Sequence, residues 1–130
     1  MIAGIGVDIV DVARIQAMLD RFGERFLRRV YTEEEAAYAM SGVNKAERLA
    51  GRFAVKEAAL KALGTGKSHG ILWRDVETLR GRYGKPEVHL HGQAVKWAKL
   101  HGVAKVFVSI THDGGKALAF LILEKAGAEE

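Results

Sequence analysis

Residues 45–66, KAERLAGRFAVKEAALKALGTG, contain the strongest helical pattern in the chain. Its large apolar residues recur at the spacing of one helix face: Leu49, Phe53, Leu60 and Leu63. Asn44 followed by Glu47 fits a capping box at the start, and Gly64 fits a C-terminal stop. We therefore predict a long helix over Lys45–Leu63.

A strip of small residues runs beside this apolar face: Ala50, Ala54 and Ala58. Small side chains allow another backbone to approach closely, so Glu57 and Lys61, which neighbour the strip, can lie in a crevice. Lys56 falls on the apolar face itself, and we expect its amine to reach solvent from the edge of the core.

The remaining periodicities predict shorter elements on both sides of this helix. In chain order they are a strand over Ile2–Val10, a helix from its cap Asp11 through Leu19 to a stop or kink at Gly23, a short helix from Thr32 to Met40, a hairpin of Val76–Leu79 with Glu87–His91, a helix over Gln93–Leu100 that ends at Gly102, and a hairpin of Val106–Ile110 with Ala117–Leu123. Thr32 and Glu35 form a second capping-box pattern. We predict an α+β fold, a small antiparallel sheet packed with one long and several short helices, in a single domain over residues 1–130.

Composition excludes several kinds of function. The 130 residues contain no cysteine, which rules out disulfide scaffolds, thiol nucleophiles, iron–sulfur clusters and cysteine-based zinc sites. No apolar run approaches the roughly 20 residues that cross a bilayer, so we expect no membrane role. The N-terminus, MIAGIGVDIVD, has no basic segment and carries carboxylates where a signal peptide is apolar, which favours a cytoplasmic protein.

The charge of +4 points to an acidic partner, and the arginines are concentrated near the N-terminus. On a continuous helix one stripe would contain Arg14, Met18, Arg21, Arg25 and Arg28, beside a core face of Ile15, Leu19, Phe22 and Phe26. A solvated basic face and a docking surface for an acidic helix both fit this stripe. A nucleic-acid-binding module is disfavoured, because committing the two phenylalanines to the core leaves no stacking platform.

Three charged residues suggest a site for a metal and phosphate. Asp8 lies in an otherwise apolar strand, where a carboxylate requires a cation, either an ordinary salt-bridge partner or a metal ion. Glu57 and Lys61 fit an ordinary surface pair one helical turn apart. Two carboxylates with lysines and a glycine-rich loop nearby also suit a magnesium phosphate site. The loop GTGKSHG is not a P-loop, since it follows a helix where that motif requires a strand.

Four segments resemble one known family. They are GIGVDIVDVARI at Gly4 to Ile15, AGRFAVKEAALKALGTG at Ala50 to Gly66, GKP at Gly84 to Pro86, and SITHDGGKALAF at Ser109 to Phe120. In order and spacing they resemble the holo-[acyl-carrier-protein] synthases, the small trimeric class of 4'-phosphopantetheinyl transferases. The resemblance implies transfer of 4'-phosphopantetheine from coenzyme A to a serine hydroxyl of an apo acyl carrier protein, with release of adenosine 3',5'-bisphosphate.

The resemblance also implies roles for individual residues. Asp8 and Glu57 would hold Mg²⁺, and Lys61 would neutralise charge on the phosphates and the leaving group. Contacts to the nucleotide side of coenzyme A would come from Arg52, Lys61, Gly64, Thr65, Lys85, Pro86, Thr111 and His112, with His112 near the 3'-phosphate. The base for the acceptor serine stays open between an activated water, Glu57 and one of the residues 33–35.

Assembly and partners are implied as well. The family resemblance predicts a homotrimer with active sites shared across subunit interfaces, and docking of the acidic, helical carrier protein on the face of Arg14, Met18, Arg21, Arg25 and Arg28. A family member without activity that only binds the carrier is the remaining alternative. The presence of Asp8, Glu57 and Lys61 argues against it.

Overall fold

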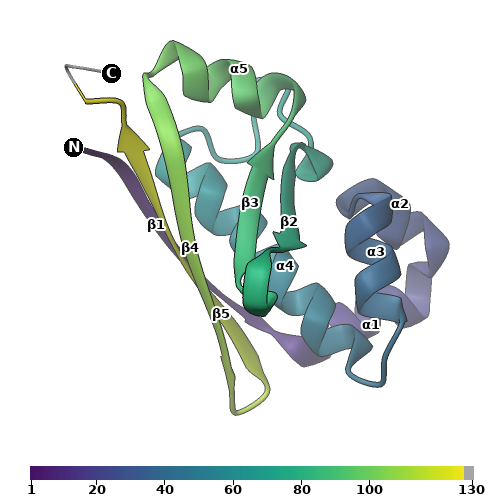
Figure 1. Cartoon of the computed structure of the whole chain (residues 1–130). Coiled ribbons are helices and arrows are strands. Elements are labelled where there is room, and N and C mark those ends of the chain that lie inside the picture. The colour runs from purple at the N-terminus through teal and green to yellow at the C-terminus, as the bar shows by residue number, and fades with distance from the viewer. Residues whose placement is uncertain (128–130) are drawn as a thin grey trace.

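The computed structural model describes residues 1–127 and consists of a long helix lying against a small sheet, with the short helices of residues 12–40 grouped at one end of the long one and the short helix of residues 92–100 near its other end (Figure 1). The elements are β1 (Ile2–Asp11), α1 (Val12–Phe22), α2 (Glu24–Val30), α3 (Glu33–Met40), α4 (Lys45–Leu63), the 3-10 turn η1 (Trp73–Asp75), β2 (Val76–Arg80), the 3-10 turn η2 (Arg82–Gly84), β3 (Pro86–Leu90), α5 (Gly92–Leu100), β4 (Val103–Asp113) and β5 (Lys116–Lys125). The α+β prediction is confirmed, and α4 has the predicted bounds.

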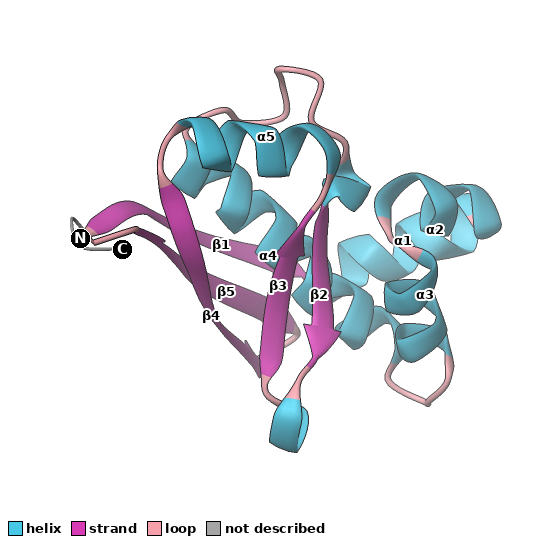
Figure 2. Cartoon of the chain, turned by 45° about the horizontal axis from the view of Figure 1, so that its top comes forward, coloured by secondary structure: helices cyan, strands magenta, loops and turns pink. Residues whose placement is uncertain are grey.

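The strands form two sheets where we predicted one. β1, β5 and β4 form a three-stranded antiparallel sheet in that order, and the β2–β3 hairpin forms a separate pair. The views in Figures 1 and 2 place this hairpin beside α4, with α1, α2 and α3 grouped together away from the larger sheet. Strand pairing depends on tertiary contacts, so periodicity alone did not reveal the division.

Close contact between β1 and α4 confirms the interpretation of the small-residue strip. A β-carbon placed on Gly4 would lie 2.2 Å from the carbonyl oxygen of Ala62, and one on Gly6 would lie 1.8 Å from that of Ala58. Only glycine fits at such distances. Because side chains alternate along a strand, Asp8 faces α4 on the same side as these glycines.

Helix termini follow the sequence in part. The Thr32–Glu35 capping box is present, Gly64 ends α4 in a left-handed conformation with φ of 80°, and Gly23 separates α1 from α2. The predicted Asn44 box is absent, since Asn44 makes no side-chain cap within the described chain. Asp11 does precede α1, but its carboxylate pairs with Lys116 and does not cap the helix.

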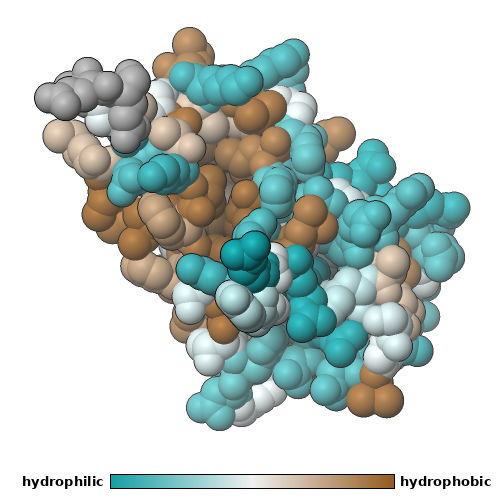
Figure 3. Space-filling view, in the orientation of Figure 1, coloured by the Kyte–Doolittle hydropathy of each residue, from teal (hydrophilic) through white to brown (hydrophobic). Residues whose placement is uncertain are grey.

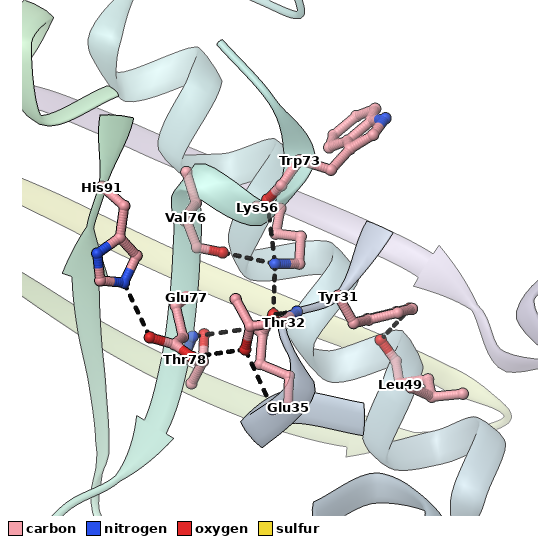
Figure 4. A network of polar contacts seen from close by, with 10 residues as sticks. All are labelled: Tyr31, Thr32, Glu35, Leu49, Lys56, Trp73, Val76, Glu77, Thr78 and His91. Atoms are coloured by element: carbon pink, nitrogen blue, oxygen red, sulfur yellow. Dashed lines mark hydrogen bonds and ion pairs between the residues drawn. The ribbon is translucent and has the colours of Figure 1, made fainter. Parts of the chain in front are cut away.

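A buried polar network connects α3, α4 and the small sheet (Figure 4). The prediction for Lys56 was wrong, because its side chain is enclosed and its amine lies 2.7 Å from Glu35, 3.1 Å from the Trp73 carbonyl and 2.5 Å from the Val76 carbonyl. Glu35 also accepts the backbone N–H of Thr78 at 2.9 Å. These bonds satisfy a charge pair that would otherwise be costly to bury. The network therefore fixes β2 and η1 against the long helix.

The second face of the larger sheet is apolar, and no described part of this single chain covers it. Its residues alternate with those that pack on α4 and include Ile5, Val7, Ile9, Phe107 and Phe120. Figure 3 shows apolar side chains gathered over this side of the molecule. Apolar patches of this kind mark contact surfaces.

Within residues 1–127, no helix combines the length and the apolar character that crossing a membrane requires.

Candidate functional site

Asp8, Glu57 and Lys61 come together where β1 crosses α4. The amine of Lys61 donates to Asp8 Oδ1 at 2.7 Å and to the Val7 carbonyl at 3.1 Å. The Asp8 side chain is 11 % exposed and that of Lys61 is 56 % exposed. Asp8 therefore has an ordinary cationic partner in this chain, and the site is open to solvent through the lysine.

Glu57 is the electrostatically strained member of the group. Burial raises the pKa of Glu57, and the neighbouring Asp8 carboxylate raises it further through its charge and a hydrogen bond, while Arg14 and Lys61 oppose the shift. The hydrogen bond to Asp8 is the main cause that raises the pKa of Lys61. A second cation beside the two carboxylates would relieve their repulsion.

The donor set fits a hard divalent cation with an incomplete protein shell. Asp8 and Glu57 supply carboxylate oxygens, which Mg²⁺ prefers. In the part of the chain that the structure describes, no group of three or more histidine or acidic residues could hold a metal. Mg²⁺ commonly uses one or two carboxylates and completes its octahedron with water and phosphate oxygens. The pair therefore suits a metal that arrives with, or binds, a phosphate ligand.

A cationic pocket lies on the other flank of α4. Its volume is about 360 Å³, and four residues that the sequence singled out line it: Arg52, Lys85, Pro86 and His112. Gly51 makes room for His112, because a β-carbon at Gly51 would lie 3.1 Å from the imidazole Nε2. The His112 ring also lies 3.1 Å from the Glu47 carbonyl. Four of the eight predicted nucleotide contacts therefore share one pocket.

Sequence reasoning missed the three other charged or aromatic residues of this pocket, Tyr38, Arg48 and Arg80. Arg48 was detectable, since it lies one helical turn before Arg52 and so shares its face. Tyr38 and Arg80 carried no sequence signal, because they reach the pocket through the packing of α3 and β2 on α4.

The other four predicted contacts lie elsewhere, with Lys61 beside Asp8. Gly64 and Thr65 follow the C-terminal end of α4, one turn beyond Lys61, and do not line the arginine pocket. Thr111 alternates with His112 along β4, so its side chain faces the other side of the sheet. It pairs with Leu118, which in turn pairs with Ile9 on the uncovered face.

We call Asp8, Glu57 and Lys61 the acidic group. Within one chain a strand separates this group from the cationic pocket. Ala119 of the central β5 pairs with Asp8 on one side and with Ile110, which lines the pocket, on the other. Two interstrand spacings place these outer residues about 10 Å apart. Arg52 and Glu57 also point differently, since five residues of helix turn by about 500°, leaving them about 140° apart.

A third feature is a groove of about 620 Å³ between α1, α2 and α4. Of the predicted docking residues, Arg14, Met18, Arg25 and Arg28 line it, above a floor that includes Ile15 and Phe53. Arg21 does not line the groove; its guanidinium lies 5.2 Å from the centre of the Phe22 ring. The stripe is not on one continuous helix, because Gly23 breaks it at φ of 54°.

Burial excludes one of the residues considered as the base that would accept the proton of the acceptor serine. Glu35 is fully enclosed and bonded to Lys56 and Thr78, so it cannot reach an acceptor hydroxyl. Glu33 and Glu34 are exposed at the start of α3. Glu57, whose pKa is raised by burial and by Asp8, remains a candidate within the group that it forms with Asp8 and Lys61.

Comparison with known proteins finds relatives that all belong to one family. Residues 4–121 match a family described as the 4'-phosphopantetheinyl transferase superfamily. The holo-[acyl-carrier-protein] synthase of Solibacter usitatus is 48 % identical over 124 residues, which cover 95 % of this chain and 99 % of that protein. The synthase of Desulfovibrio desulfuricans is 52 % identical over 125 residues, covering 95 % and 98 %.

Solved structures agree with this. The crystal structure of the holo-[acyl-carrier-protein] synthase from Neisseria meningitidis superposes with a TM-score of 0.88 at 36 % identity, covering 96 % of this chain and all of that one (100 %). The Helicobacter pylori synthase in complex with coenzyme A gives 0.82 at 30 % identity, covering 92 % and 99 %.

Proposed function

The chain belongs to the 4'-phosphopantetheinyl transferase superfamily as an enzyme of the holo-[acyl-carrier-protein] synthase family, and we propose that it moves 4'-phosphopantetheine from coenzyme A to a serine of an apo acyl carrier protein, with Mg²⁺ required. The observation that carries the proposal is the group of Asp8, Glu57 and Lys61, whose two carboxylates and one amine suit a metal-bound diphosphate. We propose the cytoplasm as the location.

The reaction needs positioning and charge stabilisation more than covalent help. The serine oxygen attacks the β-phosphorus of coenzyme A, the bond from that phosphorus to the bridging oxygen breaks, and adenosine 3',5'-bisphosphate leaves while the serine proton passes to solvent or a base. Mg²⁺, held by Asp8 and Glu57, would supply Lewis-acid stabilisation of the phosphate oxygens. Lys61 lies beside the same carboxylates and would neutralise charge that develops on the leaving group.

The groove between α1, α2 and α4 is the proposed docking surface for the carrier protein. Its arginines would attract an acidic helix, and Met18 with the apolar floor would accept a buried side chain. Within the described chain, no acidic residue lines this groove, so its arginines are available to an acidic partner.

We further propose a homotrimer with each active site between two subunits. The uncovered apolar face of the larger sheet supports assembly, since apolar surface of this kind is stabilised by contact with another chain. The separation of the acidic group from the arginine pocket by β5 supports sharing, because the pocket of one copy could complete the acidic group of its neighbour. Cyclic assemblies join unlike surfaces in this way.

A carrier-protein mass assay tests the proposal. Incubation with coenzyme A, Mg²⁺ and an apo acyl carrier protein should add one phosphopantetheine mass to the carrier, and a chelator should stop the addition. Absence of any mass gain with several carriers would reject the transferase and favour a protein that only binds the carrier. Gain that persists in chelator would reject the metal requirement alone.

A further inference from the structure

Arg14 lies between the acidic group and the groove of α1, α2 and α4, which we call the carrier groove. Its guanidinium carbon is 5.5 Å from the centre of the Phe53 ring, and both residues line the groove. Phe53 precedes Glu57 by one turn of α4, so the two side chains are neighbours on the helix surface. The guanidinium on this ring is therefore one helical turn away from a carboxylate that we propose as a metal ligand.

The charge of Arg14 reaches that carboxylate. Burial and the neighbouring Asp8 raise the pKa of Glu57, and Arg14 opposes this rise more strongly than Lys61 does. Lys61 is bonded directly to Asp8, at 2.7 Å. Arg14 thus supplies positive charge to the pair of carboxylates from the side of the groove.

Arg14 has no acceptor of its own within the chain. In residues 1–127 its guanidinium takes part in no hydrogen bond or ion pair, and its close contact is the Phe53 ring. Asp11, one turn earlier on the chain, pairs with Lys116. The N–H donors of Arg14 are therefore available to a carboxylate that enters the groove.

We propose that Arg14 is a positioning residue that couples the binding of the acidic carrier protein to the binding of the divalent metal by the acidic group, so that each tightens the other. This inference rests on the proposed function, which supplies the carrier and the metal. In the free enzyme the charge of Arg14 acts on Glu57 and opposes a second cation there. A carrier carboxylate that pairs with Arg14 cancels this charge, so the metal binds more tightly. Coupling between two binding sites is reciprocal, so the metal tightens the carrier by the same factor.

The other arginines of the groove lack this position. Arg25, on α2, lies 5.8 Å from the centre of the Phe22 ring. Of the described arginines that line the groove, Arg14 alone is among the charges that shift the pKa of Glu57. Arg25 can therefore attract an acidic carrier but does not connect it to the metal.

Metal titrations of the full chain test the coupling. Mn²⁺ is the probe, since it takes the same oxygen ligands as Mg²⁺ and its unbound form is counted by electron paramagnetic resonance. Without carrier, Arg14→Gln should bind Mn²⁺ about threefold more tightly than the wild type or better, because the opposing charge is gone. Apo carrier protein, added without coenzyme A so that no transfer occurs, should tighten Mn²⁺ about fivefold in the wild type and not in Arg14→Gln. A titration of the carrier alone corrects for the metal that it binds itself.

Arg25→Gln is the matched control. It should weaken carrier binding, yet its affinity for Mn²⁺ without carrier should equal that of the wild type, and saturating carrier should still tighten the metal. Asp8→Asn should lose the Mn²⁺ binding, which assigns the signal to the acidic group. Thermal unfolding of each variant verifies the fold, and a damaged fold does not produce the tighter metal binding expected of Arg14→Gln.

The outcomes separate this inference from the proposed function. An Arg14→Gln variant whose Mn²⁺ affinity without carrier is unchanged or weaker overturns the coupling, because an arginine that only docks the carrier would leave the metal unaffected. A wild type whose metal affinity does not respond to the carrier overturns it as well, even where the carrier mass assay succeeds. A wild type that binds no Mn²⁺ and modifies no carrier rejects the proposed function and the coupling with it.

Discussion

Gly6 of β1 lies against Ala58 of α4 so closely that a β-carbon on Gly6 would be 1.8 Å from the Ala58 carbonyl oxygen. This contact brings the strand that carries Asp8 onto the helix that carries Glu57 and Lys61. The absence of a side chain at Gly6 therefore allows Asp8 to lie beside Glu57 and Lys61.

Substituting Gly6 with alanine should destabilise the protein. The new methyl cannot be accommodated without moving β1 from α4, and overpacking of this kind costs about 1–3 kcal/mol. Chemical denaturation should show this loss, together with weaker binding of Mg²⁺. In the control Gly42→Ala, the added carbon meets the flexible end of Arg48 at 2.9 Å, so its stability should change little. Equal stability of the two variants would refute the close-contact explanation.

Replacing Asp8 with asparagine should reduce phosphopantetheine transfer by about a hundredfold or more, because one of the two carboxylates proposed to hold the metal loses its charge. Activity measured against Mg²⁺ concentration should shift to higher metal. Asp11→Asn is the matched control, as Asp11 lies on the same strand and pairs with Lys116 away from Glu57. Unchanged metal dependence in Asp8→Asn would remove this residue from the metal site.

Much of the fold was predictable because local signals and tertiary contacts agreed. The bounds of α4 followed from its periodicity and from Gly64, and the spacing of small residues predicted the close approach of another backbone element, which the structure identifies as β1. Lys56 was misjudged because its partner, Glu35, is 21 residues away in sequence and no local pattern reveals the pairing. Pairing between distant elements is set by packing, which propensity does not describe.

Some residues of the candidate site could likewise be predicted from the sequence, and others could not. Asp8 and Glu57 stood out because a carboxylate in an apolar setting requires explanation. Tyr38 and Arg80 did not, since an aromatic residue on a short helix and an arginine at a strand end are ordinary on their own. They can be recognised as parts of one pocket only in the folded chain, where the Arg80 guanidinium lies 5.3 Å from the centre of the Tyr38 ring.

Glu77 should make stability depend on pH in the acidic range. Burial alone would raise its pKa, but hydrogen bonds from Thr32 and His91, the latter at 2.9 Å, lower the pKa of Glu77 below 4.5. A carboxyl with a depressed folded-state pKa contributes stability that is present above the unfolded value and is lost as pH falls through the folded one. Thermal unfolding should therefore show the wild type more stable than Glu77→Gln at neutral pH, with the gap closing below about pH 4.5.

Glu87→Gln is the control for this pH effect. Glu87 lies on the same hairpin, 3.6 Å from His89, but both side chains are largely exposed. Solvent screening makes such a pair weak, so the stability difference should stay small across the range. A gap for Glu77→Gln that does not narrow in acid would show that the charge of Glu77 contributes nothing to folding.

Introducing lysine at Phe120 should disrupt the proposed assembly. Phe120 is 41 % exposed in the single chain and lies at the centre of the uncovered sheet face, between Val7 and Ser109. A charge buried at an apolar interface is costly. Light scattering should report the mass of one chain, and transfer activity should fall. Val43→Lys, at an apolar residue 95 % exposed on the loop before α4, should leave the mass unchanged.

Mixing two inactive variants should restore activity if sites are shared between subunits. Asp8→Asn removes a residue of the acidic group, and Arg52→Gln removes one from the arginine pocket, which lies across β5 in the same chain. When the two chains are unfolded together and reassembled in equal amounts, a site with both functional surfaces arises wherever an Asp8-bearing surface meets an Arg52-bearing one. Random assembly into a cyclic trimer gives about one quarter of the sites this arrangement, so about a quarter of the wild-type transfer rate should return.

The control is the double variant that carries both substitutions, mixed in the same way with either single variant. In a mixture with Asp8→Asn every chain lacks Asp8, and in a mixture with Arg52→Gln every chain lacks Arg52. No complete site can form in either mixture, so no activity should return. Failure of the mixed single variants to regain activity, with assembly verified by light scattering, would place the complete site within one chain.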